Sequence, residues 1–233
     1  MTKPECNFDS LFFHLNPIGD ELLWSNLSLP DRRLKMLCVA ECNLSLRGAK
    51  AIIENIKPEH HHMTYLDLHG NYLGNEILKL VTEMVQNYNL LEFIGLGKNN
   101  INSVSQATEL LSLIGKTELS AEHMTRINER IRERNMIIEK NKKLRTLKKP
   151  EEYVFYVETP ILSEETKTYY INAKENMRFI NLMENQFVGM GILEAIKDCY
   201  MRAPQMAFSL EGNKPAFPNM SSVKNLFGHK VIL

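Results

Sequence analysis

Hydrophobic residues recur along this chain with a period far longer than that of one helix or one strand. In the segment 34–56, apolar residues occupy positions 1, 4, 6, 11, 19 and 23, with Cys42 at position 9 and Gly48 at position 15. The segment 63–85 repeats this pattern, with Asn71 at position 9 and Ile77 at position 15. Two copies in phase at eight positions predict an array built from one small structural unit.

Further copies carry the same pattern with varying completeness. The copy at 177–199 fills all eight positions, whereas the copy at 91–113 matches the first five and then slips by about one residue. A degenerate copy precedes all of these, and a partial copy follows them. The six copies begin near residues 8, 34, 63, 91, 177 and 205.

Each copy predicts a short strand, a tight turn and a helix. Positions 4 and 6 alternate with polar or small residues, as in a strand with one buried face. The Asn or Cys at position 9 is expected inside the turn, where its side chain can bind backbone groups that lack a ladder partner. Ser45 and Asn102, at position 12, are predicted helix N-caps. Positions 15, 19 and 23 then form one apolar helix face, which only a stack of units can bury.

The eight-position pattern resembles the leucine-rich-repeat family. The spacing of 28 to 29 residues and the glycine or aliphatic residue at position 15 resemble its ribonuclease-inhibitor-like subclass. The fold that this resemblance implies is an α/β solenoid, with parallel strands on a concave face and helices on a convex face.

The array is interrupted after residue 115. The step from Leu91 to Met177 is 86 residues, about 58 more than one repeat needs, so the chain is predicted to divide into repeats, an insertion, closing repeats and a tail. Two unrecognisable copies are the alternative. The predicted divisions are 1–115, 116–176, 177–218 and 219–233.

Within the insertion, a charged helix of four to seven turns is expected between Ser120, a suitable N-cap, and Pro150, which ends it. The segment EEYVFYVETP, 151–160, alternates like a strand. The segment ETKTYYINAKE, 165–175, is expected to pair with it or to lie along the solenoid.

This arrangement of repeats, charged helical insertion and closing repeats resembles certain axonemal leucine-rich-repeat proteins of motile cilia. The resemblance implies a non-enzymatic scaffold in the axoneme, within a large multi-subunit ciliary complex. A cytosolic regulatory adaptor outside cilia, for example one that binds a small GTPase, is the alternative.

Charge is balanced overall but not locally. The chain has 28 basic and 28 acidic residues, whereas residues 116–150 hold eleven Lys or Arg and five Asp or Glu. The basic end of the insertion can meet an acidic partner such as a tubulin tail or, less in keeping with the neutral chain, nucleic acid. The alternative is a solvated helix face. The cations of this basic end are Lys140, Lys142, Lys143, Arg145, Lys148 and Lys149.

No signal peptide or membrane-spanning run is recognisable, and four scattered cysteines do not form a disulfide framework. A cytoplasmic protein without membrane partners is therefore expected.

One stretch invites a catalytic interpretation. FIGLGKNNI, 93–101, contains Gly95, Gly97 and Lys98, but it lacks the glycine spacing and the hydroxyl of a phosphate-binding loop. In the repeat register the two glycines are outward strand positions, where the wall is expected to be thin enough for a partner's backbone to approach. Adjacent histidines at 60–62 are expected in a solvated loop, and Cys42 is expected to be buried. No enzyme, cofactor or metal site is predicted.

Large apolar residues at outward strand positions predict a protein-binding groove instead. The alternatives are that the insertion or the chain's own termini cover this stripe, or that single exposed residues there have no function. The predicted contact residues are Phe12, Met36, Tyr65, Asp67, His69, Phe93, Lys98, Phe179, Met183 and Glu184.

Overall fold

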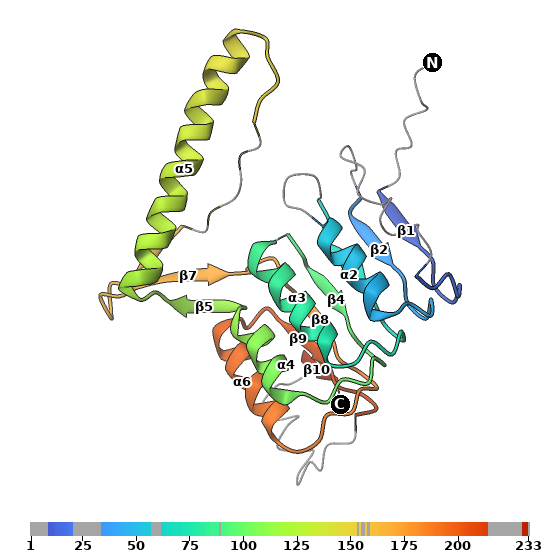
Figure 1. Ribbon diagram of the computed structural model, residues 1–233. Helices are drawn as coiled ribbons and strands as arrows, with labels where there is room; N and C mark the ends of the chain where they lie inside the picture. The colour runs from blue at the N-terminus through green and yellow to red at the C-terminus, as the bar shows by residue number, and fades with distance from the viewer. Residues whose placement is uncertain are drawn as a thin grey trace, which may run out of the picture. The chain divides into compact units, whose positions relative to one another are not determined.

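The computed structural model divides the chain into two compact units (Figure 1). The first combines residues 1–115 with 174–233, and the second is 116–173. The structure describes residues 9–20, 34–56, 62–88, 90–152, 154, 157, 159–213 and 230–232.

A parallel sheet of seven strands forms the first unit. Six of the strands occupy positions 3 to 5 of the six predicted copies, because positions 4 and 6 alternate as a half-buried strand requires. In sheet order the strands are β1 (Ser10–Phe12), β2 (Met36–Cys38), β3 (Tyr65–Asp67), β4 (Phe93–Gly95), β8 (Phe179–Asn181), β9 (Ala207–Ser209) and β10 (Val231–Ile232).

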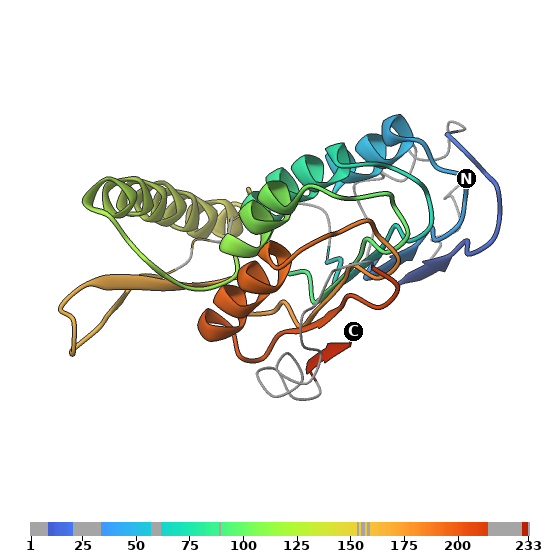
Figure 2. The same cartoon turned by 90° about the horizontal axis from the view of Figure 1, so that it is seen from below.

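The helices described in the first unit lie along one side of this sheet (Figure 2). They are α2 (Leu46–Asn55), α3 (Glu76–Asn87), α4 (Val104–Ser112) and α6 (Gly191–Arg202). Helix α2 packs on α3, α3 on α4, and α4 on α6. The prediction of an α/β fold with parallel strands is confirmed. We call the side of the sheet opposite these helices the front face.

The interruption leaves the register of the parallel sheet intact. Strand β4 pairs directly with β8, and Phe93 lies opposite Phe179, although 86 residues separate them. None of the strands described within 116–173 joins the seven-stranded sheet. The alternative of two hidden copies in the insertion is therefore wrong.

The core lies between the sheet and the helices. Position 4 contributes one fully buried residue in each regular strand, and positions 15, 19 and 23 contribute the inner helix face. The position 4 residues are Leu37, Leu66, Ile94, Ile180 and Phe208, each exposed by 1% or less. Burying a side chain of this size contributes about 1.5–3 kcal/mol.

A buried hydroxyl without a partner lies in this core. Thr82 on α3 is 3% exposed, and its hydroxyl oxygen has no hydrogen-bond partner. Replacement by valine keeps the shape and removes the unpaired hydroxyl. Thr82→Val is therefore expected to raise the free energy of unfolding by about 1 kcal/mol, measured by urea denaturation. A loss of stability would show that the hydroxyl has a partner in solution.

The second unit combines one long helix with a small sheet. Helix α5 (Ala121–Thr146) begins directly after Ser120 and spans 26 residues. Strand β7 (Tyr169–Ala173) lies between β5 (Gly115–Glu118) and β6 (Ile161–Leu162), and it pairs antiparallel with β6.

The predicted strand at 151–160 is wrong for every described residue of that segment. Buried Asn141 of α5 explains this, because its amide nitrogen donates to the Glu152 carbonyl at 2.6 Å and its amide oxygen accepts from the Glu152 N–H at 2.7 Å. These bonds occupy backbone groups that a sheet ladder would otherwise use. The segment 165–175 pairs through β7 with β6 instead.

Two helix starts test the predicted N-caps. Ser45 caps α2 by accepting from the Arg47 N–H, as predicted. The prediction for α4 is wrong by one residue, since Ser103 caps this helix by accepting from the Gln106 N–H. The Asn102 amide oxygen instead accepts from the Asn75 side chain of the preceding repeat.

Candidate functional site

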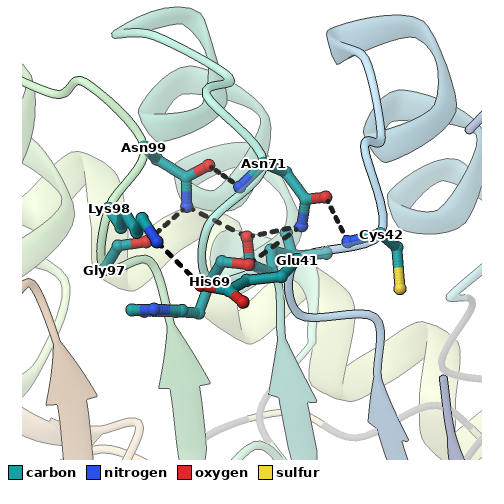
Figure 3. A network of polar contacts seen from close by, with 8 residues as sticks. Glu41, Cys42, His69, Asn71, Gly97, Lys98 and Asn99 are labelled. Atoms are coloured by element: carbon teal, nitrogen blue, oxygen red, sulfur yellow. Dashed lines mark hydrogen bonds and ion pairs between the residues drawn. The ribbon is translucent and has the colours of Figure 1, made fainter. Parts of the chain in front are cut away.

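Buried amides at position 9 hold the turns that follow the strands (Figure 3). The Asn99 side chain is fully buried; its oxygen accepts from the backbone N–H groups of Asn71 and Leu73, and its nitrogen donates to the carbonyls of Leu68 and Gly97. Asn71 and Asn185 bind the neighbouring turns in the same way. These bonds fix the strand ends and thereby the side chains of the front face.

Cysteine takes this role in one repeat. The Cys42 thiol is fully buried, as predicted, and donates to the carbonyls of Phe13 and Ala40. Burial raises the pKa of this thiol. Cys42 is therefore a neutral structural group at neutral pH.

Three predicted contact residues form a stack of aromatic rings across the front face. The ring centroids of Tyr65 and Phe93 are 4.1 Å apart with planes inclined by 7°, and those of Phe93 and Phe179 are 5.6 Å apart and inclined by 6°. The rings come from β3, β4 and β8, which pair in register. Because the faces cover one another, a partner would meet the ring edges, which are electropositive.

Asp67 supplies a polar centre beside this stack. One carboxylate oxygen accepts from the His69 N–H at 3.1 Å, and the other lies 3.4 Å from the Tyr65 hydroxyl. The same oxygen is 3.8 Å from the Cys38 thiol. Burial and the nearby Asp67 charge raise the pKa of both Tyr65 and Cys38. Both side chains therefore stay neutral donors toward the carboxylate.

The prediction of a thin wall at Gly95 and Gly97 is wrong. Both glycines are buried, and a Cβ at Gly95 would lie 2.0 Å from the Asp67 carboxylate oxygen. A Cβ at Gly97 would lie 2.5 Å from His69 Nδ1 and 2.8 Å from Met183 Cγ. The glycines are needed because neighbouring side chains lie over them, and a partner's backbone has no access there.

The same stretch is not built as a phosphate-binding loop. A phosphate cradle needs free backbone N–H groups. Here the N–H groups of Leu96 and Lys98 donate to the carbonyls of Asn181 and Met183, and that of Asn99 donates to the Asn185 side chain.

An ion pair at the edge of the front face joins Lys98 to a residue that the sequence prediction missed. Lys98 Nζ lies 2.8 Å from Glu41 Oε1, and this hydrogen bond lowers the pKa of the glutamate. Both residues hold position 8, where the backbone has positive φ, and Gly70 holds the same position in the repeat between them. A Cβ at Gly70 would lie 2.5 Å from Glu41 Cγ, so glycine leaves room for the pair. The sequence signal for this ion pair is a pair of opposite charges at position 8 of two repeats, with glycine at position 8 of the repeat between them.

The remaining predicted contact residues are not part of the stack. Phe12 is 59% exposed, whereas Met36, next to Tyr65 in the sheet, is half-buried. Glu184 is exposed at position 8. Its Cγ would be 2.8 Å from a Cβ at Gly212, which holds position 8 of the next copy, so this side chain lies against the following turn.

The six predicted cations of the insertion belong to the second unit and fall into two sets. Lys140, Lys142 and Arg145 pair with glutamates, whereas Lys143, Lys148 and Lys149 are exposed without an ion pair to any described residue. His60 and His61 lie outside the described residues, and His62 is exposed.

No protein-family model matches this chain, and no curated protein matches it. Within the described ranges, no group of three His, Cys, Asp or Glu side chains could hold a metal ion. No helix in the described part of the chain is both long and apolar enough to cross a membrane. The geometry of the front face is therefore the basis for a functional proposal.

Proposed function

We propose that this chain is a leucine-rich-repeat solenoid of the ribonuclease-inhibitor-like kind and acts as a non-enzymatic protein-interaction scaffold. The regular spacing of strands in register, with buried amides at every complete turn but one, supports the fold assignment. Arrays of this kind bind partners through the face that their strands line.

The aromatic stack carries the functional part of this proposal. Tyr65, Phe93 and Phe179 place three large rings side by side on a sheet face, where outward residues are ordinarily polar. Each ring remains partly exposed, so its edge is open to a partner. Asp67 beside the stack can accept a hydrogen bond or pair with a cation of that partner.

The resemblance to axonemal repeat proteins supports a more specific proposal. The chain would be a structural component of the ciliary or flagellar axoneme, with partners inside a large multi-subunit complex. Imaging a tagged chain in ciliated cells tests this placement. Labelled axonemes are expected, and a diffuse cytosolic signal would favour the adaptor alternative.

Binding through the front face is tested with Tyr65→Asp/Phe93→Asp. Two carboxylates among the rings would break the stack and introduce charge into an apolar contact, so partner recovery in quantitative copurification is expected to fall at least about tenfold. The matched control is Met201→Asp, which changes an apolar residue that is 74% exposed on α6.

The double variant must first show the helix content and melting behaviour of a folded chain. Equal recovery of the same partners by wild type, the folded double variant and the control would contradict binding through the front face.

A further inference from the structure

The basic end of α5 contains cations whose charge is already balanced. The guanidinium of Arg145 donates from Nε and Nη2 to the two carboxylate oxygens of Glu151, at 2.7 and 2.8 Å. Lys142 Nζ lies 2.6 Å from Glu139 Oε1, and Lys140 pairs with Glu152. These three cations are occupied within the second unit.

Three lysines in the same stretch remain available. Lys143, Lys148 and Lys149 are exposed and have no ion pair with any described residue. Leu147 lies among them with 64% of its surface exposed. We call Lys143, Leu147, Lys148 and Lys149 the lysine end.

The backbone of the lysine end is ordered by hydrogen bonds. The Lys149 N–H donates to the Leu144 carbonyl and the Lys148 N–H to the Arg145 carbonyl, both at 3.0 Å. Together with the positive φ of 52° at Lys148, these bonds form a Schellman motif. Glycine is the usual residue at this position, because a side chain there is strained. The lysines thus lie on a fixed turn, and Lys148 occupies the position of this turn where glycine is favoured.

We propose that the lysine end binds an acidic peptide segment of a partner protein. Ammonium groups would pair with the carboxylates, and Leu147 would contact an apolar side chain between them. This inference rests on the proposed function only in taking the partner to be a protein, since the lysine end belongs to the other unit of the chain.

The composition of the lysine end favours a peptide over other polyanions. Recognition of single-stranded nucleic acid relies on aromatic or arginine side chains that stack on bases, and the lysine end contains neither. Sites on anionic membranes are recognised by clusters of about four to eight cations, more than the three available here.

The first test measures binding of a short fluorescent glutamate peptide with a central leucine to the full chain, by anisotropy at low salt. Lys143→Gln/Lys148→Gln/Lys149→Gln is expected to weaken binding about tenfold. Lys79→Gln/Lys167→Gln/Lys197→Gln removes the same charge from exposed sites elsewhere and is expected to weaken it less than about twofold. No binding by wild type, or equal weakening by both triple variants, would overturn the proposal.

A second test asks whether the ion pairs within the second unit prevent Lys142 and Arg145 from binding the peptide. Glu139→Gln/Glu151→Gln releases Lys142 and Arg145 and is expected to tighten peptide binding by about threefold or more. Glu164→Gln/Glu165→Gln makes the same change in net charge in the turn between β6 and β7, and is expected to have a smaller effect. Equal effects would contradict the division into two sets.

The choice of partner is tested with two further probes. Tighter binding of a single-stranded oligonucleotide or of anionic phospholipid vesicles than of the peptide would overturn the assignment to an acidic peptide. The Tyr65→Asp/Phe93→Asp variant is expected to bind the peptide as wild type does, so failure of the front-face proposal and failure of this one are distinguishable.

Discussion

Asn99→Ala is expected to lower the free energy of unfolding by about 4 kcal/mol. The Asn99 side chain makes four buried hydrogen bonds, but losing them does not cost the same free energy for each partner group. The carbonyls of Leu68 and Gly97 each keep another donor, from the Asn71 side chain and the Gly70 N–H. The buried N–H groups of Asn71 and Leu73 donate to no other described acceptor, so both would be left unpaired. Each unpaired group costs about 1–3 kcal/mol.

The matched control for this prediction is Asn16→Ala. Asn16 holds the same position in the degenerate first copy and also donates to two carbonyls, but it is exposed. Water can replace its bonds, so a cost below about 1 kcal/mol is expected. Urea denaturation with unchanged slope measures both variants. Similar midpoints for the two variants would show that the buried amides do not hold the array together.

Gly95→Ala is expected to destabilise the chain by about 2–3 kcal/mol. The new Cβ would lie 2.0 Å from an Asp67 carboxylate oxygen and 2.7 Å from its Cγ. This carboxylate is held by the His69 N–H and by the Tyr65 hydroxyl, so it cannot move without breaking contacts on the front face. The backbone at Gly95 does not have positive φ, so the cost comes from the clash alone.

A double-mutant cycle isolates this clash. Asp67→Ala removes the carboxylate, so adding Gly95→Ala to that background is expected to cost at least about 1 kcal/mol less than it does in wild type. Thermal and urea denaturation of the four proteins give the coupling. Additive costs would show that Asp67 does not lie over Gly95 in solution.

Gly97→Ala provides a comparison of a different kind. The atoms that its Cβ would meet belong to His69 and Met183, and His69 Nδ1 has no hydrogen-bond partner. These side chains can shift at lower cost, so a smaller loss than at Gly95 is expected. The two glycines therefore differ in how firmly their neighbours are held.

Parts of the candidate site were predictable because they follow from the repeat register. Tyr65, Phe93 and Phe179 share position 3, so strands paired in register necessarily bring them side by side. The stacking of their faces depends on ring rotation, which no spacing specifies. Glu41 was missed because its partner Lys98 lies two repeats further along the chain.

The sequence by itself determined the repeating unit of this protein. Positions 4, 6 and 9 placed the strands, their buried face and the buried amides, since a periodic pattern reports directly which side of each element is buried. It also located the interruption and its helix, because loss of the pattern and a charged run need no knowledge of contacts.

Only the tertiary structure decided which groups contact one another across repeats. The Asp67 carboxylate lies over Gly95, and the Asn102 side chain accepts a hydrogen bond from Asn75. Strand β10, in the segment predicted as a tail, pairs with β9 at the end of the sheet. Each outcome depends on a neighbour far away in sequence but adjacent in the stack. A one-dimensional pattern reports which side of each element is buried, but not which side chains of neighbouring repeats meet. These contacts are decided only when the strands align.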